Sequence, residues 1–309
     1  MIGIYPPWGN VLGLARTLIY SAIGLTLLLT PGWVLFTPLL GVEPQYGCEG
    51  IRNYTLFCSI PDSGLSFAQY ISGSFMLVAA IGFYPALFAV PSAYIAFSLS
   101  LGTSLPDGGD QIASSLLILL TLNGLSDWRR SHWSPSEYLE HDQLSRVRII
   151  LGGSSLFLAR LQVSIVYFFA GIEKLSSGAW ADGSAIYMWI RHISFGAPEW
   201  LRPLLWHLTE VPLFSASITW ATMGLEVALG VSLLLPRNVA VKLLLPAGVL
   251  FHVGILFAMG IASFAVVMVG ALLILLPPPG SNMQSPTRML EGFRSIFSRG
   301  GDKVLVSKA

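Results

Sequence analysis

Long apolar runs separated by short polar segments make up most of the chain. A helix needs about 20 mainly apolar residues to cross a bilayer, and eight windows meet or approach that length. The predicted spans are residues 11–29, 67–84, 86–102, 111–126, 155–175, 214–235, 239–258 and 261–277. The fourth and eighth are short, so six spans with re-entrant or interfacial helices is the alternative. The pattern predicts an all-α, polytopic transmembrane helix bundle.

Basic residues between the spans indicate which helix ends face the cytoplasm. They concentrate in the connector after the fourth span, in the connector between the sixth and seventh, and in the tail. With eight spans all three segments fall on one side, which the positive-inside rule makes cytoplasmic. We therefore expect both termini inside, with residues 1–10 as a stub and 278–309 as a tail. Apolar residues on one side of 285–297 predict an amphipathic helix in that tail.

The opposite side receives the long stretch 176–213, which is rich in tryptophan and tyrosine. Amphipathic rings favour the headgroup region, so we expect this stretch to form interfacial helices. Cys48 and Cys58 fall in one loop on the same side, where oxidation is permitted. They are predicted to form a structural disulfide.

Composition supports a membrane protein and excludes other classes. Of 309 residues, 54% are hydrophobic and only 11% are charged, against roughly 25% charged residues in soluble domains. The net charge of +1 and the lack of a basic patch give no reason to expect nucleic-acid binding. No His/Cys cluster has metal-ligand spacing, so no metal site is predicted. His132 and His141, in the connector after the fourth span, are expected to be surface residues.

Ionisable residues within the spans are the candidates for chemistry, because each costs several kcal/mol at membrane depth unless it is paired or wet. Arg160, Tyr167 and Lys174 share one polar face of the fifth span, together with a serine and a glycine at helical spacing. That face should point into the bundle. Glu226 on the sixth span and His252 on the seventh are predicted to meet it there.

Two interpretations of Lys174 remain open. In the first, the charges pair and hold the helices together, with Lys174 neutralising Glu226. Alternatively, Lys174 sits near the outer mouth of a polar hollow, where desolvation favours its neutral amine and lets it act as a base. On the same side, Asp107, Asp110, Trp180 and Asp182 are the predicted substrate-binding residues. Asp110 is also placed to cap the helix that follows "DGG".

Several of these stretches resemble a known domain. "YFFAGIEKL" (167–175) with "WADGSAIYMWI" (180–190) is similar to the central motif of the HTTM membrane domain. "SITWATMGLEVALGVSLLL" (217–235) and "FHVGILFAMGIASF" (251–264) are similar to its later segments. That domain is shared with the vitamin K-dependent gamma-carboxylases, and the resemblance predicts it over residues 11–277.

Within that superfamily the resemblance is to the sporulation-delaying protein B branch. It is carried by "LGLART" (12–17), "CEGIRNYTLFC" (48–58), "DGGDQIASSLLILL" (107–120) and "LSDWRRSHW" (125–133). The branch implies a multi-pass component of the bacterial cell (inner) membrane that helps to produce a secreted antimicrobial peptide. The expected partners are the peptide precursor and a small protein encoded nearby.

The carboxylase relatives imply a chemistry. There the lysine that matches Lys174 deprotonates a reduced quinone, which starts oxygen-dependent carboxylation of glutamates on a peptide. "QIASSLLIL" (111–119) stands where the carboxylases carry a histidine- and asparagine-rich stretch. Three functions therefore stay open: a membrane maturation factor using Lys174, a quinol-dependent carboxylase-like enzyme, and a non-catalytic transporter, scaffold or immunity-type protein.

Overall fold

The protein is an all-α bundle. The computed structural model describes residues 6–36, 48–104, 107–135 and 142–283, and these ranges contain helices and turns but no strand. The α-helices are α1 (Asn10–Leu29), α2 (Gly32–Phe36), α3 (Leu65–Ile81), α4 (Pro85–Gly102), α5 (Gly108–Leu119), α6 (Thr121–Ser126), α7 (Gln143–Glu173), α8 (Gly178–Ala181), α9 (Ala185–Ile190), α10 (Arg202–Glu210), α11 (Pro212–Gly230), α12 (Arg237–Val239), α13 (Leu245–Met259) and α14 (Ala262–Leu275). A π-helical turn, Ala240–Leu244, joins α12 to α13.

Six helical segments are long and apolar enough to cross a membrane. They are Asn10–Leu29, Asp62–Ile81, Pro85–Gly102, Gln143–Ser176, Pro212–Gly230 and Arg237–Met259. Each contains most of one predicted span, so the prediction of a polytopic helical bundle is confirmed. The helix that contains the predicted fifth span is longer than that span, because Asp142 accepts a hydrogen bond from the Ser145 N–H at 3.1 Å and α7 starts at residue 143.

The two remaining spans of the eight predicted are shorter than expected. The last corresponds to α14, which has 14 residues. The fourth is divided into α5 and α6, because the Ser155 hydroxyl inserts between them. This hydroxyl donates to the Leu119 carbonyl and accepts from the Asn123 N–H at 3.0 Å. It thereby replaces the helical hydrogen bond between those two residues.

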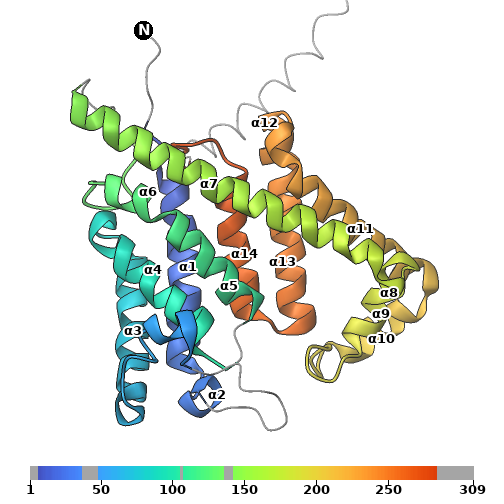
Figure 1. Cartoon of the computed structure of the whole chain (residues 1–309). Coiled ribbons are helices and arrows are strands. Elements are labelled where there is room, and N and C mark those ends of the chain that lie inside the picture. Colours follow the sequence, from blue (N-terminus) through green and yellow to red (C-terminus); the bar gives the residue numbers. More distant parts are fainter. Residues whose placement is uncertain (1–5, 37–47, 105–106, 136–141, 284–309) are drawn as a thin grey trace, which may run out of the picture.

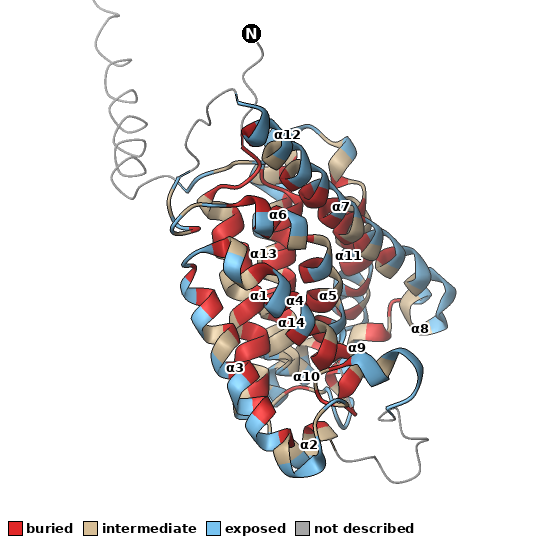
Figure 2. Ribbon diagram, turned by 60° about the vertical axis from the view of Figure 1, so that its left-hand side comes forward, coloured by how far each residue is buried: buried red, intermediate tan, exposed pale blue. Residues whose placement is uncertain are grey.

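The centre of the bundle is α1, which packs between α3 and α14 (Figure 1). Gly24 and Gly73 let α1 and α3 approach closely: a Cβ on Gly24 would lie 3.0 Å from the Gly73 carbonyl oxygen. The long helix α7 runs diagonally past these elements, with α11 packed along it (Figure 1). Figure 2 shows the buried residues gathered inside the bundle, while exposed residues mark the outward face of α3.

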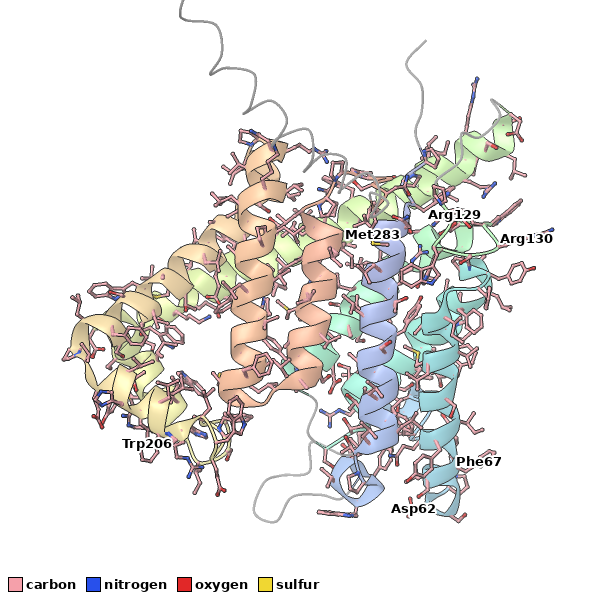
Figure 3. All side chains as sticks on the ribbon, turned by 180° about the vertical axis from the view of Figure 1, so that it is seen from behind. Asp62, Phe67, Arg129, Arg130, Trp206 and Met283 are labelled. Atoms are coloured by element: carbon pink, nitrogen blue, oxygen red, sulfur yellow. A yellow bond between two sulfur atoms is a disulfide. The ribbon has the colours of Figure 1, made fainter. Side chains whose placement is uncertain are left out.

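Both described ends of the chain lie at the same end of the bundle. The Gly280 N–H donates to the Pro7 carbonyl at 3.0 Å, and the Asn10 N–H donates to the Asn282 side chain at 3.2 Å. Figure 3 shows Arg129, Arg130 and Met283 at this end, whereas Asp62, Phe67 and Trp206 lie at the opposite end. The distribution matches the predicted grouping of basic segments. The predicted stub (1–10) lies partly outside the described residues, and the predicted tail helix lies wholly outside them.

At the opposite end, Cys48 and Cys58 form the predicted disulfide. The stretch 176–213, predicted to form interfacial helices, folds as the short helices α8, α9 and α10 and the start of α11. Several of its rings are exposed, among them Trp200 at 70%.

Of the two histidines predicted to lie on the surface of the basic end, His141 lies outside the described residues, and the prediction for His132 is wrong. His132 is 1% exposed rather than on the surface. Its ring occupies space that Gly82 leaves free, since a Cβ there would lie 2.1 Å from the His132 Nε2 atom. Burial, together with the charges of Arg16 and Arg129, lowers the pKa of His132 to about 3. Asp127, fully buried, accepts hydrogen bonds from both arginines, at 2.9 Å from Arg16 and 2.7 Å from Arg129.

Candidate functional site

Two glycines bring α7 and α11 into backbone contact. A Cβ on Gly171 would lie 3.0 Å from the Val227 nitrogen, and one on Gly230 would lie 2.6 Å from the Phe168 Cα. Helices that meet through such small residues bring their flanking side chains within hydrogen-bonding reach. Lys174 follows Gly171 by one helical turn and therefore faces α11.

Lys174 and Glu226 form an ion pair across this contact. The Lys174 Nζ atom donates to the two Glu226 carboxylate oxygens at 2.8 and 2.7 Å, and to the Ala170 carbonyl at 3.0 Å. These three acceptors use all three ammonium protons. The side chain of Lys174 is 23% exposed and that of Glu226 only 9%. The Trp180 ring centroid lies 5.1 Å from Nζ, within cation–π range.

Tyr167 and His252 form a second polar pair. The Tyr167 hydroxyl lies 2.7 Å from the His252 Nε2 atom, and both residues are almost fully buried. The other ring nitrogen, Nδ1, is buried and has no hydrogen-bond partner among the described residues. Gly260, with a φ of +72°, makes the turn from α13 into α14 and returns the chain so that Phe264 packs edge-on against the His252 ring.

A cavity of about 290 Å³ lies between these two pairs. Residues of α5, α7, α11, α13 and α14 line it, together with Lys174: Gly108, Gln111, Ile112, Val166, Tyr167, Ala170, Glu226, Phe251, His252, Ile255, Phe264 and Met268. The expected polar hollow is therefore largely apolar, with its polar groups confined to a few positions. Such a mixture is typical of small-molecule sites, where apolar walls enclose a few orienting groups.

The structure brings together four of the five predicted catalytic residues but not Arg160. This residue precedes Lys174 by 14 positions on α7, a distance of about 21 Å along a helix. Its Nε and Nη2 atoms donate to the Leu275 carbonyl at 2.9 and 2.6 Å, at the end of α14. Arg160 lies on the same buried face of α7 as Tyr167. It is too far along the helix from Lys174 to reach the cavity.

Asp110 takes part in capping α5, as predicted, but the N-cap residue itself is Asp107. The Asp107 carboxylate accepts from the Asp110 N–H at 2.8 Å, and the Asp110 carboxylate accepts from the Asp107 N–H at 3.2 Å. This reciprocal pair is a capping box. Asp110 is 5% exposed, and burial followed by the charge of Asp107 raises its pKa to about 7. Gly108 and Gln111 of this turn line the cavity, so the turn borders the site.

Trp180 and Asp182, also predicted to bind substrate, lie in different surroundings. Trp180 stands over Lys174, whereas Asp182 lines a separate cavity of about 530 Å³ beside α9, α10 and α11. The Asp182 carboxylate accepts from the Ser184 N–H at 2.8 Å.

Sequence reasoning missed the apolar walls of the site. Phe251, Phe264 and Met268 line the cavity. The sequence pattern of a span does not distinguish an apolar residue that faces lipid from one that faces a cavity. Gln111 is the one missed lining residue with a visible signal, because it is an amide at the start of an apolar run. Within the described part of the chain, no group of three or more His, Cys, Asp or Glu residues is placed to hold a metal.

Comparisons with known proteins identify the family. Residues 143–278, which comprise α7 to α14, match the HTTM domain. The chain is 31% identical over 285 residues to the sporulation-delaying protein SdpB of Bacillus subtilis (strain 168), covering 91% of this chain and 85% of that protein. It is 29% identical over 280 residues to the uncharacterized protein YitO of the same organism, covering 90% and 88%. No solved structure matches the chain.

The HTTM match contains every residue of the two polar pairs. It does not test the predicted domain limits of 11–277, which stay a prediction. The long similarity to SdpB adds the N-terminal helices to the comparison. Together with the six segments able to span a membrane, these findings show that the chain is a multi-pass membrane protein of the HTTM-domain family that includes sporulation-delaying protein SdpB.

Proposed function

We propose that this protein is an integral membrane maturation factor that helps to produce a secreted antimicrobial or toxin peptide from its precursor, with Lys174 as the base. The observation that carries the proposal is the cavity of about 290 Å³ that holds the Lys174–Glu226 and Tyr167–His252 pairs. The similarity to sporulation-delaying protein SdpB supports the biological setting.

The ion pair gives Lys174 a route to the neutral amine. Transfer of one proton from the Lys174 ammonium to the Glu226 carboxylate leaves an amine and a carboxylic acid, neither of which is charged. A low-dielectric site favours this neutral pair more than water does. The amine can then accept a proton from a bound molecule, while Glu226 keeps the first proton until it is returned.

Tyr167 and His252 are proposed to orient the bound molecule. The Tyr167 hydroxyl is held by the His252 Nε2 atom, which fixes the position of both side chains. We propose that the His252 Nδ1 atom, which has no hydrogen-bond partner among the described residues, exchanges a hydrogen bond with the bound molecule. Phe251 and Phe264 supply flat apolar walls that exclude water.

A quinol-dependent, carboxylase-like reaction is the second candidate, and the aromatic lining is the observation that favours it. Phe251, Phe264 and Tyr167 suit a hydroxylated aromatic ring, and Lys174 and His252 offer hydrogen-bonding groups at its edge. A reduced quinone bound there would supply reducing equivalents for oxygen-dependent carboxylation of glutamate. Lys174 would take the proton of a ring hydroxyl, while the aromatic walls keep water away.

The peptide substrate is proposed to approach past α8 and α9. Trp180 covers Lys174, and Asp182 with Glu210 lines the larger cavity of about 530 Å³ beside it. Asp107 and Asp110 hold the turn that forms another wall of the site. In our proposal this end of the bundle faces outward from the bacterial cell membrane, both termini are cytoplasmic, and a small partner protein encoded nearby assists.

The test is to express the precursor peptide with and without this protein, and to analyse cells and medium by mass spectrometry. The proposal expects the mature peptide in the medium only when this protein is present. Addition of carbon dioxide to a glutamate of that peptide would select the carboxylase-like reaction. Mature peptide trapped inside cells that lack the protein would instead assign it to transport. Normal mature peptide in their medium would reject any role in production.

A further inference from the structure

A second cavity lies far from Lys174, where α7 passes the connection between α11 and α13. Its volume is about 180 Å³. The polar residues that line it are Arg160, Ser232 and Arg237, and the apolar ones are Phe157, Leu233, Leu235, Ala240, Leu275 and Leu276. None of these residues belongs to the site described above, apart from the displaced Arg160.

Arg160 brings a charge into this cavity for which the described residues provide no ion-pair partner. The residue is 8% exposed, and its guanidinium is anchored by two hydrogen bonds to the Leu275 carbonyl. Among the described residues, no carboxylate forms an ion pair with Arg160 or Arg237. Arg237, which lines the same cavity, carries a charge of the same sign. Buried charges in proteins are ordinarily paired, so this arrangement is incomplete.

Ser232 provides an independent sign of a missing partner. It is 3% exposed, and its hydroxyl oxygen is buried with no hydrogen-bond partner among the described residues. A hydroxyl left unpaired in an apolar setting costs free energy that a ligand oxygen would recover. Ser232, Arg160 and Arg237 line one small cavity, and the side chains of all three can donate hydrogen bonds.

The geometry points to a binding site for the phosphate group of an anionic phospholipid. Guanidinium groups match phosphate oxygens in charge and in planar, two-pronged geometry. The location favours a lipid as the source of that phosphate. Arg237 begins the segment Arg237–Met259, which is able to span the membrane, so the cavity lies where such a helix meets the headgroup region. Phe157, 59% exposed at the same cavity, offers a surface to acyl chains.

The test uses the full-length protein, purified in detergent and mixed with defined lipids, with retained lipid counted by native mass spectrometry. We expect one dioleoylphosphatidylglycerol to be retained per protein, in preference to dioleoylphosphatidylcholine. Arg237→Gln should weaken its affinity about tenfold, the effect of losing one charge-assisted contact. Ser232→Ala should weaken it about threefold, as expected for a neutral hydrogen bond. Arg237 is chosen for substitution because it is exposed. Substitution of the buried Arg160 could instead prevent folding.

Arg146→Gln is the matched control, because Arg146 is an exposed arginine on α7 that does not line the cavity. It removes the same charge and should leave retention unchanged. Equal retention by wild type and Arg237→Gln would overturn the proposal, as would equal retention of the two lipids. Displacement of the lipid by millimolar inorganic phosphate would assign the site to free phosphate and reject the lipid.

Discussion

The Nζ atom of Lys174 lies 2.8 and 2.7 Å from the two carboxylate oxygens of Glu226, beside the backbone contact that Gly171 makes between α7 and α11. Glu226 is the more buried partner, and Lys174 is also partly buried. Removing either residue therefore leaves the other charge with few groups to pair with. The pair is therefore both a structural contact and the proposed source of a neutral amine. Variants can separate these two roles.

Glu226→Gln should destabilise the protein by about 1–3 kcal/mol, because the partly buried Lys174 ammonium loses its counter-charge. Combining it with Lys174→Met removes both charges and should recover most of that loss. The measurement is thermal unfolding of the purified variants in detergent. Under our account the double variant is stable but yields no mature peptide. A double variant that restores peptide production would mean that Lys174 only neutralises Glu226.

Gly230→Ala should separate α7 from α11. Its Cβ would lie 2.6 Å from Phe168 backbone atoms, which cannot move without shifting the helix. We expect a loss of about 1–3 kcal/mol and a fall in peptide production, since the Lys174–Glu226 distance depends on this contact. Gly224→Ala, on the same helix, is the control because no atom lies near its Cβ position. Equal stability and activity of the two variants would show that close helix contact is not required.

Tyr167→Phe should leave both nitrogens of His252 without a partner in the described protein. The expected cost is about 1–3 kcal/mol, together with reduced peptide production because the oriented hydroxyl is lost. Tyr94→Phe removes an exposed hydroxyl that donates to the Tyr54 carbonyl at 3.1 Å, and should change stability by less than about 0.5 kcal/mol. Unfolding temperatures of the two variants provide the comparison, and indistinguishable values would contradict the assigned role of the Tyr167–His252 pair.

Asp110→Asn should stabilise the protein more at pH 8 than at pH 5. Burial, then Asp107, raises the pKa of Asp110 from 3.8 to about 7 in the folded protein. The neutral acid is favoured by folding, so its contribution is complete below pH 3.8 and is lost as the pH rises through 7. Asparagine stays neutral, so the unfolding free energy of the variant relative to the wild type increases by up to about 1.4 kcal/mol per pH unit between about pH 3.8 and 7. The same stability difference at both values would place Asp110 in an ordinary, solvated environment.

Much of the fold follows from the hydrophobic pattern, because a membrane helix must be long and apolar. The segments around α1, α3, α4, α7, α11 and α13 were recognisable for this reason. The division of α5 from α6 was not, because it depends on the Ser155 hydroxyl, which reaches it from a distant helix. His132 looked exposed for a similar reason, since the space that buries it is created by Gly82 on another segment.

The site was only partly predictable. Helical phase placed Tyr167 and Lys174 on one face, and charges within spans singled out Glu226 and His252. Helical phase shows which face of a helix a residue lies on, but not which part of a neighbouring helix it meets. It therefore could not show that Arg160 donates to the Leu275 carbonyl of α14. It also could not show which phenylalanines line the cavity, because that depends on how α13 turns into α14 at Gly260.

Lys174→Arg tests the central claim most directly, with mature peptide in the medium measured by mass spectrometry at matched protein levels. Arginine keeps the positive charge and can still pair with Glu226, but its guanidinium does not lose a proton under physiological conditions. We expect a folded, membrane-inserted protein that produces no mature peptide. Wild-type amounts of mature peptide from the arginine variant would contradict the role of Lys174 as a base.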